Sequence, residues 1–79
     1  MKTQLDSLRK QIDGIDESIV NLLAERMKVV KKVGEYKKTN NIPSFDKKRW
    51  QEILKSKRGY IKKIWKTIHN EALKIEKLL

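Results

Sequence analysis

The sequence predicts an all-α protein built from three helices, of long, short and medium length. The first observation is the spacing of apolar residues between Leu5 and Tyr36, which alternates steps of three and four as on one helix face. The second is a break around Pro43, a residue that disfavours helical geometry in its predecessor. The third is renewed helical spacing between Ile61 and Leu79, with no strand-like alternation of apolar and polar residues.

The first helix is expected from about Lys2 to about Lys38, a length of roughly 50 Å at 1.5 Å per residue. Arg26 interrupts its apolar stripe once. A long helix with so narrow a stripe needs partner helices, and we expect a homodimer to supply them. The stripe consists of Leu5, Leu8, Ile12, Ile15, Ile19, Leu22, Val29, Val33 and Tyr36.

The two remaining helices follow the break at residues 39–45. Asp46 is a good N-cap for a short helix over about 47–57, and Gly59 separates this helix from a third over about 60–78. We expect one domain over residues 1–79. The apolar faces consist of Trp50, Ile53 and Leu54 in the second helix, and of Ile61, Ile64, Trp65, Ile68, Ala72, Ile75 and Leu79 in the third.

Composition narrows the classes of function. The 20 Lys and Arg outnumber the 10 Asp and Glu, and the resulting charge of +10 favours anionic partners such as nucleic acid, phosphates or polycarboxylates. The sequence has no cysteine for disulfides or thiolate metal sites, and His69 is the one histidine. No apolar run reaches the roughly 18–20 residues of a membrane span, and no signal peptide is visible. We expect a cytoplasmic protein without a metal or cofactor.

Arg26 is the most informative residue because it occupies a stripe position that is normally buried. A buried guanidinium is costly unless an anion meets it. Lys37 lies eleven residues later, within roughly 20° of the same helix face at 100° per residue. The two cations therefore predict a site for a small anionic ligand inside a helical assembly.

The polar residues near the apolar faces are Arg9, Arg26, Lys37, Asp46, Arg49 and Glu76. Their order and spacing resemble the all-helical AroQ class of chorismate mutases. The resemblance runs through residues 8–13, 15–16, 22–26, 33–37, 42–43, 46–49 and 64–68, and so covers essentially the whole chain. It implies an intertwined homodimer that rearranges the dicarboxylate chorismate to prephenate, in phenylalanine and tyrosine biosynthesis, without a cofactor.

The resemblance also implies a role for each of these residues. Arg26 and Arg49 correspond to arginines that bind the substrate's carboxylates within one chain, and Arg9 to an arginine that completes the partner's site. Arginine suits this role because its planar fork binds a carboxylate through two hydrogen bonds.

The resemblance implies three more site residues, two of them at the reacting atoms. Lys37 corresponds to the lysine that hydrogen-bonds the ether oxygen, where negative charge develops as the carbon–oxygen bond breaks. Glu76 stands opposite, where the family carries glutamine or, in some members, glutamate, and it donates a hydrogen bond only when protonated. Asp46 matches a polar site residue.

Two substrate-binding positions depart from the family pattern. Trp50 replaces the usual glutamate that accepts a hydrogen bond from the substrate's ring hydroxyl, and Ala72 stands where serine is common. These departures affect recognition of the hydroxyl and leave the carboxylate contacts intact.

Simpler interpretations stay open for single residues. Glu76 and Arg49 could each have a purely structural role in a salt bridge. Glu76 would then pair with Lys37 or a nearby lysine, and Arg49 would pair with Glu52 or Asp46. At the level of function, the alternatives are a relative that eliminates pyruvate from isochorismate, a basic helical dimer that binds nucleic acid, and a plain coiled-coil module.

Overall fold

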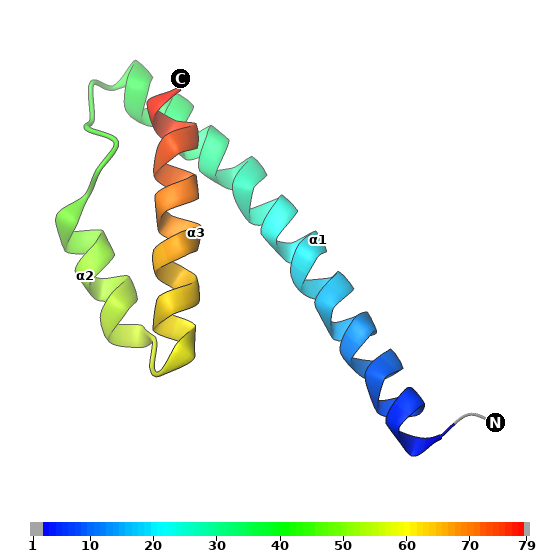
Figure 1. Ribbon diagram of the computed structural model, residues 1–79. Helices are drawn as coiled ribbons and strands as arrows, with labels where there is room; N and C mark the ends of the chain where they lie inside the picture. The colour runs from blue at the N-terminus through cyan, green and yellow to red at the C-terminus, as the bar shows by residue number, and fades with distance from the viewer. Residues whose placement is uncertain (1–2, 79) are drawn as a thin grey trace.

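A computed structural model describes residues 3–78, and every regular element within them is an α-helix (Figure 1). The helices are α1 (Gln4–Thr39), α2 (Lys47–Ser56) and α3 (Tyr60–Lys77). The all-α class and the long, short and medium helices are therefore confirmed. The predicted ends differ by one or two residues, a range over which helix ends ordinarily vary. Lys2 and Leu79, which we assigned to the first helix and the third stripe, lie outside the described residues.

Side chains near the helix ends explain where α1 and α2 begin. Thr3 and Asp6 form a capping box, in which each side chain accepts a hydrogen bond of 3.2 Å from the backbone N–H of the other. The Asp46 carboxylate accepts a hydrogen bond of 2.9 Å from the backbone N–H of Arg49, which confirms Asp46 as the N-cap of α2. Gly59 has a φ of +58°, which lets the chain turn sharply into α3.

The three helices do not form a compact body. The C-terminal part of α1 packs against α3, α2 runs beside α3, and the N-terminal half of α1 projects away from both (Figure 1). The radius of gyration is 16.8 Å, whereas a compact domain of this length has about 12 Å. The described chain is therefore extended, and its own helices do not cover the N-terminal half of α1.

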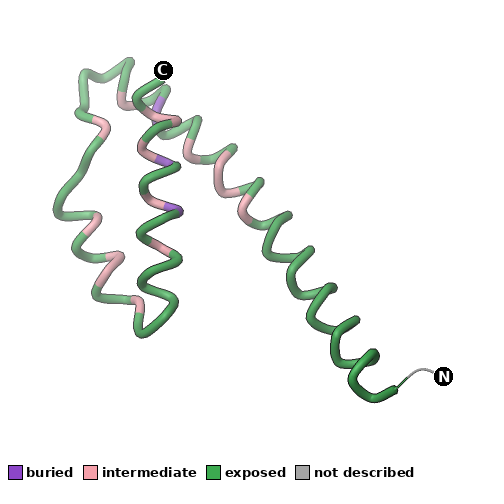
Figure 2. The backbone as a smooth tube through the Cα atoms, in the orientation of Figure 1, coloured by how far each residue is buried: buried purple, intermediate pink, exposed green. Residues whose placement is uncertain are grey.

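Burial is confined to the end where the three helices meet (Figure 2). Among the described residues only Gly34, Ile68 and Ala72 are buried, whereas residues 3–22 are exposed throughout. The exposed set includes every apolar residue of the predicted stripe: Leu5, Leu8, Ile12, Ile15, Ile19, Leu22, Val29, Val33 and Tyr36. The stripe thus lies on one helix, as predicted, but the chain's own helices leave it largely uncovered.

Candidate active site

A cavity of about 280 Å³ lies where α1, α2 and α3 meet. It combines three cations with two carboxylates and an apolar wall. The formal charge of its walls is therefore positive, which suits an anionic ligand. The lining residues are Arg26, Val29, Val30, Val33 and Lys37 from α1, Ser44 and Asp46 from the loop, Arg49 and Ile53 from α2, and His69, Ala72 and Glu76 from α3.

Arg26 has an unpaired charge in the wall of this cavity. Its Nη1 atom is buried and has no hydrogen-bond partner among the described residues. A solvated surface arginine would extend its head into water. Leaving a buried charged donor unsatisfied is costly, so this atom is positioned for a ligand oxygen from outside the chain.

Lys37 and Glu76 form the most buried ion pair in the described part of the chain. Lys37 Nζ lies 2.7 Å from Glu76 Oε1, and the two side chains are only 18 % and 11 % exposed. The geometry is that of an ion pair without a well-directed hydrogen bond at Oε1. Lys37 Nζ also donates a hydrogen bond of 2.8 Å to the backbone oxygen of Ser44. One ion pair and one hydrogen bond therefore hold the ammonium group at the cavity wall.

Asp46 and Arg49 bring the start of α2 to the same cavity. One Asp46 oxygen is engaged as the helix cap. The Arg49 guanidinium is exposed and lies 4.0 Å from Glu52, which is a weak surface contact. The pairing of Arg49 with Glu52 and the capping by Asp46 are thus both present, and neither prevents these residues from contacting a ligand.

His69 lies between two aromatic rings. Trp50 stacks on it with ring centroids 4.0 Å apart and planes 14° apart, and Phe45 meets it edge-on at 6.0 Å. Burial lowers the pKa of His69 below its ordinary value of 6.5; Glu76 opposes this shift, and Arg26 and Lys37 reinforce it. The imidazole is therefore neutral at pH 7.

The structure brings together Arg26, Lys37, Asp46, Arg49, Ala72 and Glu76 of the predicted site. Trp50 does not line the cavity, and its ring stacks on the ring of His69. Arg9 lies on the exposed part of α1, about 25 Å from Arg26 at 1.5 Å per residue.

Two polar residues of the cavity, Ser44 and His69, were not among the predicted site residues. Ser44 contributes its backbone oxygen, which any residue type would supply, so no side-chain signal marks it. His69 shares a face of α3 with Ala72 and Glu76, and this spacing was the available signal.

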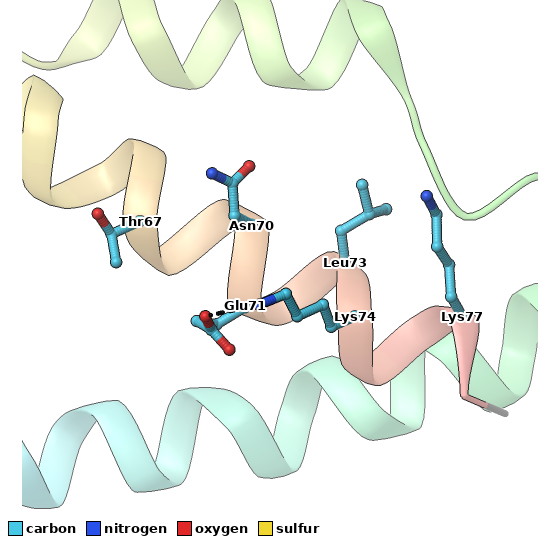
Figure 3. Close-up of a pocket in the computed structure, with 6 residues that line it drawn as sticks. All are labelled: Thr67, Asn70, Glu71, Leu73, Lys74 and Lys77. Carbon is cyan, nitrogen blue, oxygen red and sulfur yellow. Dashed lines mark hydrogen bonds and ion pairs between the residues drawn. The ribbon is translucent and has the colours of Figure 1, made fainter.

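A second, larger hollow of about 390 Å³ lies along α3 alone, between Thr67 and Lys77 (Figure 3). Its lysines and glutamate are exposed, and its one ion pair joins Glu71 and Lys74, one turn apart at 3.2 Å. A pair of this kind contributes little and leaves no buried group unsatisfied. We therefore assign the site to the smaller cavity.

None of the described helices combines the length and apolar character that a bilayer crossing requires. No cluster of three or more His, Cys, Asp or Glu side chains in the described part of the chain has the arrangement of a metal site.

The fold and site define an all-helical chain with a cavity whose walls carry more cationic than anionic side chains. The sequence profile of the family "chorismate mutase type II" matches residues 8–77, which is most of the chain. The chain belongs to this family, as its sequence predicted.

The curated relatives are longer proteins. A bifunctional chorismate mutase/prephenate dehydratase of Aquifex aeolicus is 47 % identical over 51 residues, which is 65 % of this chain and 14 % of that protein. The T-protein of Enterobacter agglomerans is 38 % identical over 73 % of this chain and 16 % of its own length. A bifunctional enzyme of the same description from Buchnera aphidicola is 33 % identical over 99 % of this chain and 23 % of its own length.

The chain thus spans less than a quarter of the length of each of these relatives. A solved structure matches it over nearly its full length. This is a conserved hypothetical protein from Pyrococcus furiosus, with a TM-score of 0.88 and 34 % identity over 96 % of this chain and 99 % of the other.

Proposed function

We propose that this chain catalyses the rearrangement of chorismate to prephenate, a step in aromatic amino-acid biosynthesis. The observation that carries the proposal is the buried, unpaired Nη1 of Arg26 in a cavity that also holds Lys37 and Arg49. Chorismate has two carboxylates and an ether oxygen on which negative charge develops during the reaction, so these three groups match three cations. Membership of the chorismate mutase type II family supports the same substrate.

The reaction needs positioning and charge more than chemical groups from the protein. One carbon–oxygen bond breaks and one carbon–carbon bond forms within the same molecule, so no nucleophile takes part. Arginines that bind the carboxylates hold the substrate in its compact reactive shape. Lys37 is already fixed by Glu76 and Ser44, so its charge can stabilise the ether oxygen without reorganisation.

Glu76 has two states with different consequences. Ionised, it holds Lys37 at 2.7 Å, as the structure shows. Protonated, it becomes a hydrogen-bond donor to the ether oxygen beside the lysine. We infer that the protonated state is the more active one.

The active form in this proposal is a homodimer whose long helices pair. Arg9 is about 25 Å from Arg26 along α1, beyond the reach of its side chain within one chain. An antiparallel pair with its two-fold axis between Glu17 and Ser18 would bring the partner's Arg9 level with Arg26, because residue 9 and residue 26 are equally far from the axis. Each site would then have four cations.

The exposed apolar surfaces support this pairing. The stripe of α1 lies open from Leu5 to Val33, and an apolar hollow of about 360 Å³ continues it between α1 and α3. A continuous apolar surface of this extent is typical of an obligate interface. The hollow is lined by Ile19, Leu22, Leu23, Arg26, Ile64, Trp65 and Ile68.

One alternative has a specific observation in its favour. Trp50 occupies the position of the usual hydroxyl-binding glutamate and does not line the cavity, so the chain is also compatible with pyruvate elimination from isochorismate. A nucleic-acid function has less support, because Arg26 and Lys37 line a cavity and not an outer surface.

The proposal is tested by turnover of chorismate, with prephenate and pyruvate assayed in the same samples. Arg26→Ala removes two charged hydrogen bonds of about 1.5–3 kcal/mol each, so kcat/KM is expected to fall at least about 100-fold. Arg58→Ala removes an exposed guanidinium outside the cavity and is the matched control.

Prephenate formed by the wild type and by the Arg58 variant, but not by the Arg26 variant, supports the mutase. Pyruvate formed from isochorismate, without prephenate from chorismate, would establish the alternative. No conversion of either substrate by a folded dimer would refute both.

A further inference from the structure

His69 is a polar group of the cavity to which the proposed chemistry gives no task. It lines the cavity beside Ala72 and Glu76, and its Nε2 atom is buried without a hydrogen-bond partner among the described residues. A buried imidazole nitrogen ordinarily has such a partner. The ligand is the remaining source of one.

The ring of His69 has a fixed orientation. Trp50 from α2 covers one of its faces at 4.0 Å, and Phe45 from the loop before α2 meets it edge-on. Contacts of this kind between aromatic rings have preferred geometries and restrict rotation. The unpaired nitrogen is therefore presented by a rigid support from two other segments of the chain.

His69 differs from the charged side chains of the cavity because its own side chain is neutral at pH 7. The groups around it are Arg26 and Lys37 on α1, Asp46 and Arg49 at the start of α2, and Glu76 on α3. Its pKa is lowered, chiefly by burial, so the ring is neutral at pH 7. A neutral imidazole is both donor and acceptor and suits an uncharged hydroxyl better than a carboxylate.

We propose that His69 binds the ring hydroxyl of chorismate through Nε2, with Trp50 as its positioning residue. This inference rests on the proposed function. The arginines and Lys37 match the two carboxylates and the ether oxygen, and the hydroxyl is the one polar group left without a partner. Trp50, which cannot accept the hydroxyl's hydrogen bond, acts through the imidazole on which it stacks.

The test compares chorismate with an analogue in which hydrogen replaces the ring hydroxyl. The ratio of their kcat/KM values is measured for the wild type, His69→Leu and Trp50→Ala. Differences in the intrinsic reactivity of the two substrates cancel between proteins, because they are the same in each ratio. His69→Gln, which keeps a hydrogen-bonding group, and Trp50→Phe, which keeps an aromatic ring, are the controls.

The ratio is expected to fall about tenfold in His69→Leu, which corresponds to one neutral hydrogen bond. Trp50→Ala should lose a similar part of the ratio, and the two controls should retain most of it. A merely structural role would reduce kcat/KM for both substrates alike and leave the ratio unchanged.

A second measurement uses only the wild-type protein and so does not depend on the variants folding. Chorismate and the analogue are each allowed to reach equilibrium with their products in the presence of the protein. The ¹⁵N chemical shift of His69 Nε2 should change in the mixture formed from chorismate. It should stay unchanged in the mixture formed from the analogue.

An unchanged ratio in His69→Leu, or equal shifts with both ligands, would overturn the inference and leave Asp46 as the hydroxyl's partner. No conversion of chorismate by the wild type would overturn the proposed function, and this inference with it.

Discussion

Ile15→Ala is expected to weaken the dimer without harming the subunit. Ile15 lies on the apolar stripe of α1 and is 60 % exposed in the single chain. Burying an entire isoleucine contributes about 1.5–3 kcal/mol, so covering its exposed part contributes about 1 kcal/mol beyond what alanine retains. Each substitution occurs twice in a two-fold interface, so the dimerisation free energy should weaken by about 2 kcal/mol. This corresponds to a roughly 30-fold higher dissociation constant.

Sedimentation at several protein concentrations measures that constant, and specific activity at the same concentrations shows whether the site depends on the dimer. Val20→Ala is the matched control, because Val20 is 64 % exposed but lies off the stripe. Activity and dimer content should fall together on dilution, earlier for the Ile15 variant. Full activity in a solution of monomers would refute the reasoning, as would equal effects of the two substitutions.

Three further predictions concern single side chains. Glu76→Gln keeps a hydrogen-bond donor for the ether oxygen and should retain most of the wild-type kcat/KM, whereas Glu76→Ala should lose about tenfold; equal values for the two variants would contradict this role. Because the pKa of His69 is lowered on folding, the unfolded chain binds more protons below pH 6.5, so stability should fall as pH drops through that region. Denaturant titrations should show this loss in the wild type and a smaller one in His69→Leu. Asp46→Ala should cost about 1 kcal/mol through loss of the cap, while Asp46→Asn keeps the cap; equal melting temperatures would argue against it.

The helices were predictable because their signals are local. Apolar spacing, the Asp46 cap and the break near Pro43 each specify structure within a few residues. The cavity was predictable in part for a related reason. Arg26 and Lys37 share one face of one helix, and a single contact with Glu76 then brings α3 to the same place.

Other features depend on tertiary geometry that spacing does not encode. The sequence is compatible with Trp50 as either a core residue or a ligand contact. In the structure, the ring of Trp50 stacks on His69, which lies on a different helix. The acceptor that Ser44 offers to Lys37 is a backbone oxygen, for which no residue type is a signal. No segment of the described chain covers residues 3–22 of the α1 stripe, so the dimer stays a prediction.

The shared site is the central claim, and mixing two inactive variants tests it most directly. Arg9→Ala and Arg26→Ala should each be nearly inactive as homodimers. In a mixed dimer, one site would contain Arg26 of one chain and the partner's Arg9, both intact. Random exchange makes about half of the dimers mixed, with one working site of two, so about a quarter of wild-type activity should return. If activity stays at the level of the separate variants although exchange is complete, the two arginines do not act in one site across the dimer.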